Sequence, residues 1–237
     1  MGNSWFQFKQ FRVEQAGSAM KVCTDACIQG AWTAASLQSC PPARVLDIGT
    51  GTGLLSLMLA QETPVIIDAV ELDETAAAQA IANFAESPWR TRLRGVQSDI
   101  RTFFHPEPYD FIITNPPFFQ NDLRGPDARR TAAMHTATLG YADLLDAIAR
   151  LLSPAGRFSI LLPYAEFRIF LELATAQGHS LRALLDIQQS PAHAPFRSVG
   201  IFGKGEAQPA ETLVIHDEHR QYTPAFSALL QPFYLYL

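Results

Sequence analysis

The feature that most constrains the fold is a repeated alternation of short apolar runs with helix-like stretches, which begins at Arg44. Runs rich in Val, Ile and Leu that alternate with Ala-rich and Leu-rich stretches are typical of βαβ units around a mostly parallel sheet. Seven strands are expected, at residues 44–48, 65–71, 93–97, 109–114, 156–162, 181–188 and 198–202. The expected helices, at residues 54–61, 74–85, 141–152 and 164–176, would cover both faces of that sheet. The predicted fold class is therefore α/β.

The segment before the first strand is an addition to this alternating core. Thr24 and Asp25 precede a helix-like sequence at residues 26–32, so either side chain could cap a short helix. The chain has 237 residues, and α/β domains of about 200–250 residues are common. We therefore expect one domain over residues 1–237, with residues 1–43 as its N-terminal extension.

Composition excludes several classes of protein. The chain is 48% hydrophobic and 17% charged, which excludes a disordered chain. Its net charge of −5 means that any contact with nucleic acid must use a local basic patch. The N-terminus has no signal-peptide core and no segment approaches the ~20 apolar residues of a membrane span, so we expect a cytoplasmic protein with no membrane partner. The cysteines Cys23, Cys27 and Cys40 lack the His or Cys partners of a zinc site, so we expect buried free thiols and no metal.

A glycine-rich turn follows the first expected strand. Gly49, Gly51 and Gly53 lie between that strand and a helix, where glycines let the backbone turn tightly and let a cofactor approach the helix N-terminus. Their even spacing differs from the G-x-G-x-x-G fingerprint of dinucleotide sites. A carboxylate at Asp47 would repel a pyrophosphate but suits S-adenosylmethionine, which carries an ammonium, a sulfonium and no phosphate. The charges therefore favour this methyl donor over NAD.

Two further acids follow the next strands. Glu71 ends the second strand roughly 20 residues beyond Gly49, the spacing of an acid that accepts bonds from ribose hydroxyls. Its alternative role is to cap the next helix, for which Asp73 is the better candidate. Asp99 follows the third strand, within reach of an adenine amine. Acids after strand ends lie where open α/β sheets bind ligands.

The fourth strand runs into Asn115, Pro116, Pro117, Phe118 and Phe119. Two prolines after a buried strand stiffen the turn. An amine on an aromatic ring or a carbonyl is a poor nucleophile, because its lone pair is delocalised. The Asn115 side-chain oxygen and the Pro116 carbonyl could each accept an N–H bond from such an amine while it attacks a methyl group. Phe118 and Phe119 could stack on a planar base. We expect Asn115, Pro116, Pro117 and Phe118 to be the catalytic residues.

Together these motifs resemble the class I S-adenosylmethionine-dependent methyltransferases, and in particular the amino-methyltransferases with an N-P-P-aromatic signature. Residues 8–11, 20–25, 30–32, 87–89 and 233–235 further resemble the bacterial family that methylates the N6 amine of adenine 37 in valine tRNA. The resemblance covers nearly the whole chain from Phe8. It implies a Rossmann-like class I methyltransferase fold, with S-adenosylmethionine as cofactor and tRNA as partner.

The same resemblance implies a set of binding residues. In that family the N-terminal segment lies near the cofactor, so residues 1–43 are expected to pack there, with Lys21, Thr24 and Asp25 helping to hold the methionine moiety. The expected cofactor-binding residues are Lys21, Thr24, Asp47, Gly49, Gly51, Gly53, Glu71, Asp99 and Asn115.

Substrate contacts are expected from a long loop. Residues 120–139 lack apolar periodicity, which predicts a loop directly after the Asn-Pro-Pro-Phe motif. Within it Arg124, Arg129 and Arg130 form a local excess of positive charge and are expected, with Phe118 and Phe119, to bind the substrate. A solvated loop with no ligand is the alternative.

Several alternatives to this function stay open on the sequence. The same architecture could methylate another planar nitrogen, such as N2 of an rRNA guanine, a DNA adenine or N5 of a protein glutamine. A non-catalytic RNA-binding relative is a further alternative, and an NAD-dependent oxidoreductase is disfavoured by Asp47 and the glycine spacing. We expect a monomer.

Overall fold

A mostly parallel sheet forms the centre of the protein, as expected. The computed structural model describes residues 3–17, 21–117 and 139–237. In this part of the chain the sheet has eight strands, in the order β10-β8-β9-β7-β6-β3-β4-β5. Every neighbouring pair is parallel except the two that involve β9, which runs antiparallel to β7 and β8. The strands are β3 (Arg44–Ile48), β4 (Ile66–Glu71), β5 (Leu93–Gln97), β6 (Tyr109–Thr114), β7 (Leu152–Pro163), β8 (Leu181–Gln188), β9 (Arg197–Phe202) and β10 (Glu211–Val214).

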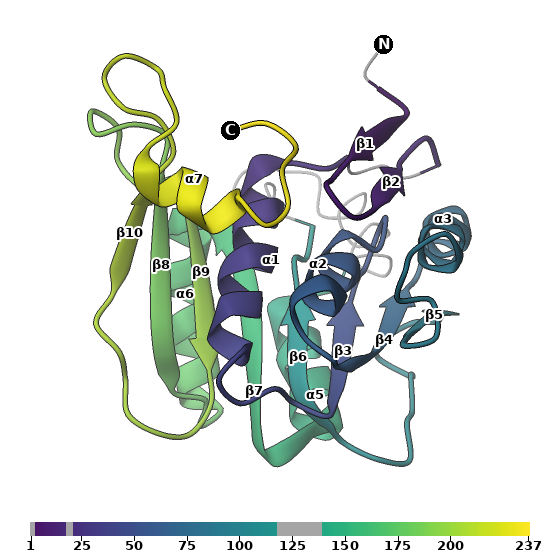
Figure 1. Ribbon diagram of the computed structural model, residues 1–237. Coiled ribbons are helices and arrows are strands. Elements are labelled where there is room, and N and C mark those ends of the chain that lie inside the picture. The colour runs from purple at the N-terminus through teal and green to yellow at the C-terminus, as the bar shows by residue number, and fades with distance from the viewer. Residues whose placement is uncertain (1–2, 18–20, 118–138) are drawn as a thin grey trace, which may run out of the picture.

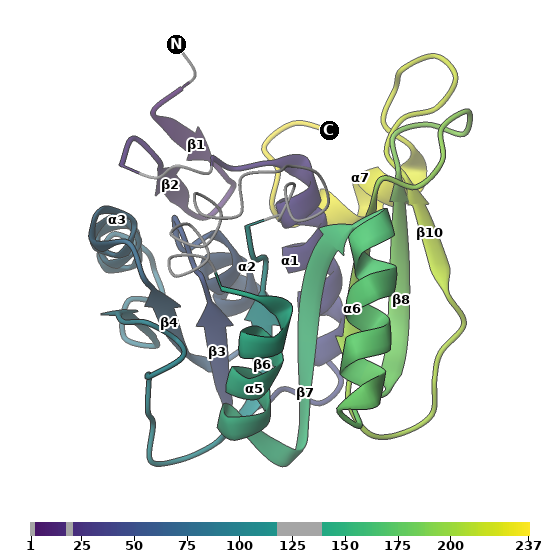
Figure 2. The same cartoon turned by 180° about the vertical axis from the view of Figure 1, so that it is seen from behind.

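Helices cover both faces of the sheet, as Figures 1 and 2 show from opposite sides. They are α1 (Thr24–Leu37), α2 (Leu54–Glu62), α3 (Glu74–Ala85), α5 (Tyr141–Leu151), α6 (Tyr164–Ala176) and α7 (Pro224–Leu230). Side chains of α1, α2, α3 and α7 belong to one hydrophobic cluster, and those of α5 and α6 belong to another. All four helices expected from the sequence are confirmed.

The central strands are buried on both faces, and this explains their continuous apolar sequences. Successive side chains of a strand point to opposite faces. In β3, Val45 belongs to the cluster under α1 and α2, whereas Leu46 and Ile48 belong to the cluster under α5 and α6. In β6, Phe111 and Ile112 divide in the same way.

Several outer elements were not expected from the sequence. The sheet has an eighth strand, β10, beyond the seven that were expected. The N-terminal segment forms a hairpin of β1 (Trp5–Gln7) and β2 (Arg12–Glu14) that the sequence did not predict, and α7 was also missed. These elements are short, and β10 buries a single side chain, Leu213, so none carries a clear hydrophobic period.

The start of α1 also differs from expectation. The helix has 14 residues, and its N-cap is Cys23, without a side-chain capping bond. Asp25 instead accepts a hydrogen bond of 2.9 Å from Nε of Arg197 in β9. The expectation of three buried thiols is wrong as well, because Cys27 is buried but Cys40 is exposed.

The two ends of the chain pack together beside α1 and α2. The backbone N–H of Lys9 donates to the carbonyl of Phe233 at 2.8 Å, and Phe8 pairs with Tyr234 in an isolated antiparallel bridge. The Gln61 side chain in α2 donates to the carbonyl of Pro232 at 2.9 Å. These bonds fix the N-terminal hairpin and α2 to the segment that follows α7. No helix in the described ranges is long and apolar enough to cross a membrane.

One buried hydrogen bond between β6 and β4 tests this description of the core. Tyr109 is fully buried, and its hydroxyl donates at 2.8 Å to Asp68, which is also buried. Tyr109→Phe should lower the free energy of unfolding by about 1–3 kcal/mol, because it leaves a buried carboxylate oxygen short of a donor. Urea denaturation measures this loss. As a control, Tyr164→Phe removes an exposed hydroxyl that accepts from Arg168 and should cost clearly less; equal losses in the two variants would contradict the prediction.

Candidate active site

Two adjoining cavities open at the carboxyl ends of β3, β4, β5 and β6. The larger has a volume of about 230 Å³, and the smaller has a volume of about 160 Å³. Gly49, Glu71 and Pro117 line both cavities. β4 and β5 lie on one side of β3 and β6 lies on its other side, and ligands of open α/β sheets bind at such a switch point.

The glycine turn has the backbone conformation that its residues predict. The φ angles of Gly49, Gly51 and Gly53 are +69°, +57° and +83°, values that residues other than glycine rarely adopt. A Cβ atom at Gly53 would lie 2.5 Å from the ring of Phe84, whereas a Cβ atom at Gly49 would have nothing within 4 Å. Gly53 is therefore needed for packing, and Gly49 keeps the shared wall of the cavities open.

The amides of this turn bond within the protein. The N–H groups of Gly49 and Thr50 donate to the carbonyl of Val70 at 2.8 and 3.2 Å. The N–H of Gly51 donates to Oε2 of Glu71 at 2.9 Å. Loops that bind phosphate use such N–H groups as donors to the ligand. This turn is thus poorly suited to a pyrophosphate, which agrees with the preference for S-adenosylmethionine over NAD that the glycine spacing and Asp47 indicated.

Asp47 lies behind the turn and lines neither cavity. It is fully buried, and its Oδ2 accepts from the hydroxyls of Thr50, at 2.6 Å, and Ser56, at 2.7 Å. Burial raises the pKa of Asp47 to about 6, although the two hydroxyl donors oppose this shift. The carboxylate therefore ties the turn to the first part of α2. A direct contact with a cationic ligand stays a prediction.

Glu71 connects the end of β4 to the glycine turn. Besides accepting from Gly51, its carboxylate accepts from the backbone N–H groups of Leu72, at 2.9 Å, and Asp73, at 3.1 Å. These bonds fix the carboxylate in the wall of both cavities. Asp73 caps α3, accepting from the N–H of Ala76 at 2.8 Å, so the capping role expected for Asp73 is confirmed.

Asp99 lines the smaller cavity beside an arginine that the sequence analysis missed. Nε of Arg101 lies 2.9 Å from a carboxylate oxygen of Asp99, and hydrogen bonding from Arg101 lowers the pKa of Asp99. Arg101 also lines this cavity. From α5, Arg150 donates to the carbonyl of Ile100 at 2.8 Å and holds the turn in place. No pattern in the sequence links Arg150 to Asp99.

Asn115 presents an acceptor with no partner in the described part of the chain. Its Oδ1 is buried, and no donor among the described residues lies within hydrogen-bond distance. The residue lines the larger cavity, and Pro116 lines the smaller one. The preceding residue, Thr114, is held from two sides: its carbonyl accepts from the Gln29 side chain, and its hydroxyl donates to the carbonyl of Ile48, both at 2.9 Å. Gln29 is buried in α1 and was also missed, since a glutamine in an apolar helix gives no functional signal.

The N-terminal segment supplies part of the wall. Lys21, Cys23 and Ala26 line the larger cavity, whereas Thr24 and Asp25 line neither. The described residues contain no group of three or more His, Cys, Asp or Glu side chains that could hold a metal ion. Five predicted site residues lie outside the described residues: Phe118, Phe119, Arg124, Arg129 and Arg130.

Solved structures share this fold. A protein described as an O-methyltransferase, from Agrobacterium tumefaciens, superposes with a TM-score of 0.64 at 14% identity and covers 88% of this chain and 96% of its own. One described as a class I S-adenosylmethionine-dependent methyltransferase, from Listeria monocytogenes, gives a TM-score of 0.62 at 14% identity and covers 92% and 71%. The fold is that of the class I methyltransferases, as predicted.

Sequence comparison narrows this class. Residues 33–138 match the family model of the methyltransferase small domain. The tRNA1(Val) (adenine(37)-N6)-methyltransferase of Tolumonas auensis is 43% identical over 99% of this chain and 98% of its own length. The enzyme of the same name from Dyadobacter fermentans is 42% identical over 98% of both chains. The chain belongs to the family of tRNA1(Val) (adenine(37)-N6)-methyltransferases.

The two glycines at either end of the turn should respond differently to substitution. Gly53→Ala should unfold at a markedly lower temperature, because the new Cβ atom meets Phe84 in a strained conformation. Gly49→Ala has room for its methyl group and should lose less stability but more affinity for S-adenosylmethionine. Thermal unfolding and calorimetric titration separate the two effects. Equal loss of affinity in both variants, in proportion to their stability, would contradict this division.

The buried carboxylate predicts a pH-dependent effect on stability. The pKa of Asp47 rises from an ordinary 3.8 to about 6 on folding, so its ionisation costs stability progressively between about pH 4 and pH 6. Asp47→Asn keeps an acceptor for Thr50 and Ser56 without that cost. The Tm of the variant should therefore exceed that of the wild type at pH 7.5, and the difference should shrink toward pH 4. A Tm difference that does not change across this range would contradict the assignment.

Proposed function

We propose that the protein transfers a methyl group from S-adenosylmethionine to the N6 amine of adenine 37 in valine tRNA. Family membership supports the substrate, since the relatives carry this activity in their names. The structural observation that carries the proposal is the buried Oδ1 of Asn115 at the cavity wall, which has no partner among the described residues. A free acceptor at that place suits an exocyclic amine, which has N–H groups to donate.

The residues around the cavities fit S-adenosylmethionine. Gly49 leaves the shared wall of the two cavities open. The carboxylates of Glu71 and Asp99 can accept hydrogen bonds from ribose hydroxyls and an adenine amine. We infer that Lys21, with the rest of the N-terminal extension, closes the methionine end, because it lines the larger cavity beside Cys23. When bound, the cofactor supplies an electrophilic methyl group on a sulfonium.

Asn115 and Pro116 would act on the amine. Oδ1 of Asn115 and the carbonyl of Pro116 each accept one N–H bond, which draws the nitrogen out of conjugation and frees its lone pair. While the methyl group passes from sulfur to nitrogen, both oxygens would stabilise the positive charge that develops on nitrogen, which would then lose one proton to water. The rigid turn at Pro116 and Pro117 and the bond from Gln29 to Thr114 keep these acceptors aligned.

The remaining predicted roles belong to the same proposal. We propose that Phe118 and Phe119 stack on the target base and that Arg124, Arg129 and Arg130 contact the tRNA backbone. Their residue types and their position directly after the Asn-Pro-Pro motif support these roles. We also propose that the protein acts in the cytoplasm as a monomer.

Removing the Asn115 acceptor tests the mechanism. Asn115→Ala should lose roughly two to three orders of magnitude in kcat, as for loss of a preorganised polar partner. Its affinity for S-adenosylmethionine, measured by calorimetry, should stay near that of the wild type. Asn115→Asp keeps an acceptor oxygen and should recover part of the lost rate. A near-normal kcat in Asn115→Ala would remove Asn115 from the mechanism, whereas loss of cofactor affinity alone would assign it to binding.

A further inference from the structure

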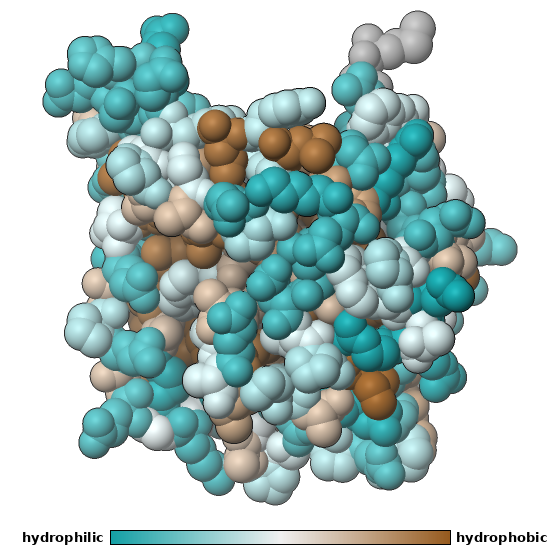
Figure 3. Space-filling model, in the orientation of Figure 1, coloured by the Kyte–Doolittle hydropathy of each residue, from teal (hydrophilic) through white to brown (hydrophobic). Residues whose placement is uncertain are grey.

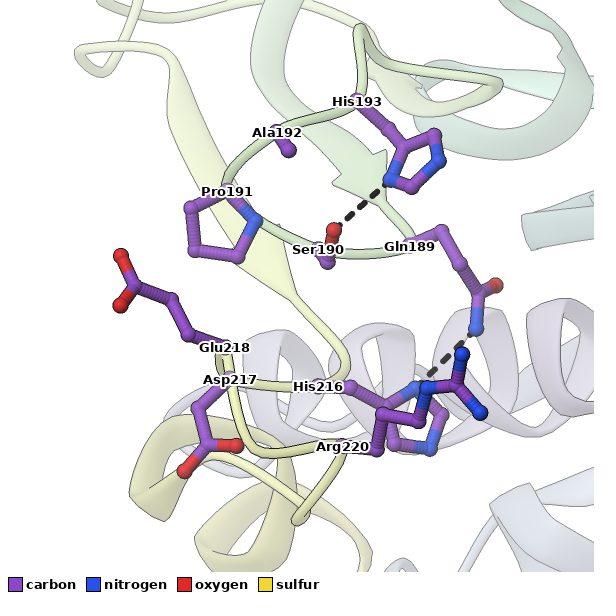
Figure 4. Close-up of a pocket in the computed structure, with 9 residues that line it drawn as sticks. All are labelled: Gln189, Ser190, Pro191, Ala192, His193, His216, Asp217, Glu218 and Arg220. Atoms are coloured by element: carbon purple, nitrogen blue, oxygen red, sulfur yellow. Dashed lines mark hydrogen bonds between the residues drawn. The ribbon is translucent and has the colours of Figure 1, made fainter.

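A second, larger cleft lies outside the candidate active site. It has a volume of about 680 Å³ and lies between residues 189–193, which follow β8, and residues 216–220, which follow β10 (Figure 4). β9 is antiparallel to both β7 and β8, so β7 and β8 run in the same direction. β6 is parallel to β7, and β10 is parallel to β8, so β6, β8 and β10 also share this direction. The cleft therefore opens at the same edge of the sheet as Asn115.

The hydrogen-bond donors and the carboxylates of this cleft lie at opposite ends. Figure 4 shows hydrogen-bond donors at one end and the carboxylates of Asp217 and Glu218 at the other. The donors come from Gln189, His193, His216 and Arg220. In Figure 3 the corresponding corner, above α7, is almost entirely hydrophilic. One end of the cleft can therefore receive an anionic group without facing the carboxylates.

His216 ends a column of stacked rings. Its imidazole stacks on Tyr222, with ring centres 4.9 Å apart and planes at 26°, and Tyr222 stacks on Phe226, at 4.6 Å and 23°. Phe226 is fully buried, so the column is anchored in the core. In addition, the Gln189 amide lies 3.0 Å from Nδ1 of His216 and fixes the ring edge. A held ring of this kind is a platform for a nucleobase, since bases stack on aromatic and histidine rings.

Arg220 occupies a backbone conformation that favours glycine. Its φ angle is +61°, the single positive value for a residue other than glycine among the described residues. The turn is held by Oδ1 of Asp217, which accepts from the N–H groups of His219, at 2.8 Å, and Gln221, at 2.9 Å. An arginine at a strained position points to a function for its side chain.

We propose that this cleft binds one single-stranded nucleotide of the tRNA substrate, away from the target adenine. His216 stacks on the base, while Arg220 and His193 donate hydrogen bonds to the phosphate. The inference rests on the proposed function for its substrate class. β8 and β10 lie three and four strands from β6, which places the cleft roughly 15–20 Å from Asn115 at about 4.8 Å per strand. A free nucleoside cannot span that separation, but a tRNA can.

The decisive variant is Arg220→Gly, which removes the guanidinium and relieves the backbone conformation together. We expect its Kd and KM for valine tRNA to rise about five- to tenfold, while kcat and the affinity for S-adenosylmethionine stay unchanged. Its Tm should stay the same or increase. The salt dependence of tRNA binding should flatten by about 0.7 log units for one lost phosphate contact. His193→Ala, which removes the ring donor, should weaken binding in the same sense.

Lys204→Gln is the matched control, because it removes one exposed positive charge from the turn after β9, at the opposite edge of the sheet. It should leave the tRNA Kd unchanged. The cleft proposal would be overturned if the wild-type enzyme methylates tRNA but Arg220→Gly and His193→Ala both keep wild-type tRNA affinity and salt dependence. If the wild type itself neither binds nor methylates tRNA, the proposed function fails, and the cleft proposal fails with it.

Discussion

The parallel pairing of β3 with β6 is the constraint on which the site depends. It places the glycine turn after β3 next to the Asn-Pro-Pro turn after β6, and the hydroxyl of Thr114 fixes the two strand ends by donating to the carbonyl of Ile48. Because both strands are buried on both faces, neither can slip by one residue without moving its side chains to the wrong cluster. The cavity is thus built from backbone that the core holds rigid, which suits a reaction that depends on alignment.

Two carboxylates then set the shape of the glycine turn. Glu71 accepts from the amide of Gly51 at the cavity wall, and Asp47 accepts from Thr50 and Ser56 behind the turn. The hydrogen bonds to Asp47 offset part of the free-energy cost of burying its charge. The same bonds hold the turn in its conformation before a cofactor binds. Asn115 complements this arrangement, since its one buried oxygen is left without a protein donor in the described part of the chain.

The sequence predicted structure best where the burial of a residue follows from a pattern within its own strand or helix. The central strands and α3 and α6 follow from continuous apolar runs and helical stretches, and the glycine and Asn-Pro-Pro turns follow from their place at strand ends. β10 and α7 were missed because tertiary contacts, rather than a periodic pattern, bury their few apolar residues. Charge placed Asp47 near the turn but could not show that it faces Thr50 and Ser56 instead of the cavity. The supports from Gln29 and Arg150 come from distant elements and leave no local signal.

The most direct measurement is nucleoside analysis of an unmodified valine tRNA transcript after incubation with the protein and labelled S-adenosylmethionine. We expect the label in N6-methyladenosine, at most one per tRNA, and no label when adenine 37 is replaced by guanine. Label in another nucleoside, or label that persists in the guanine 37 transcript, would contradict the assignment of this cavity to the N6 amine of adenine 37.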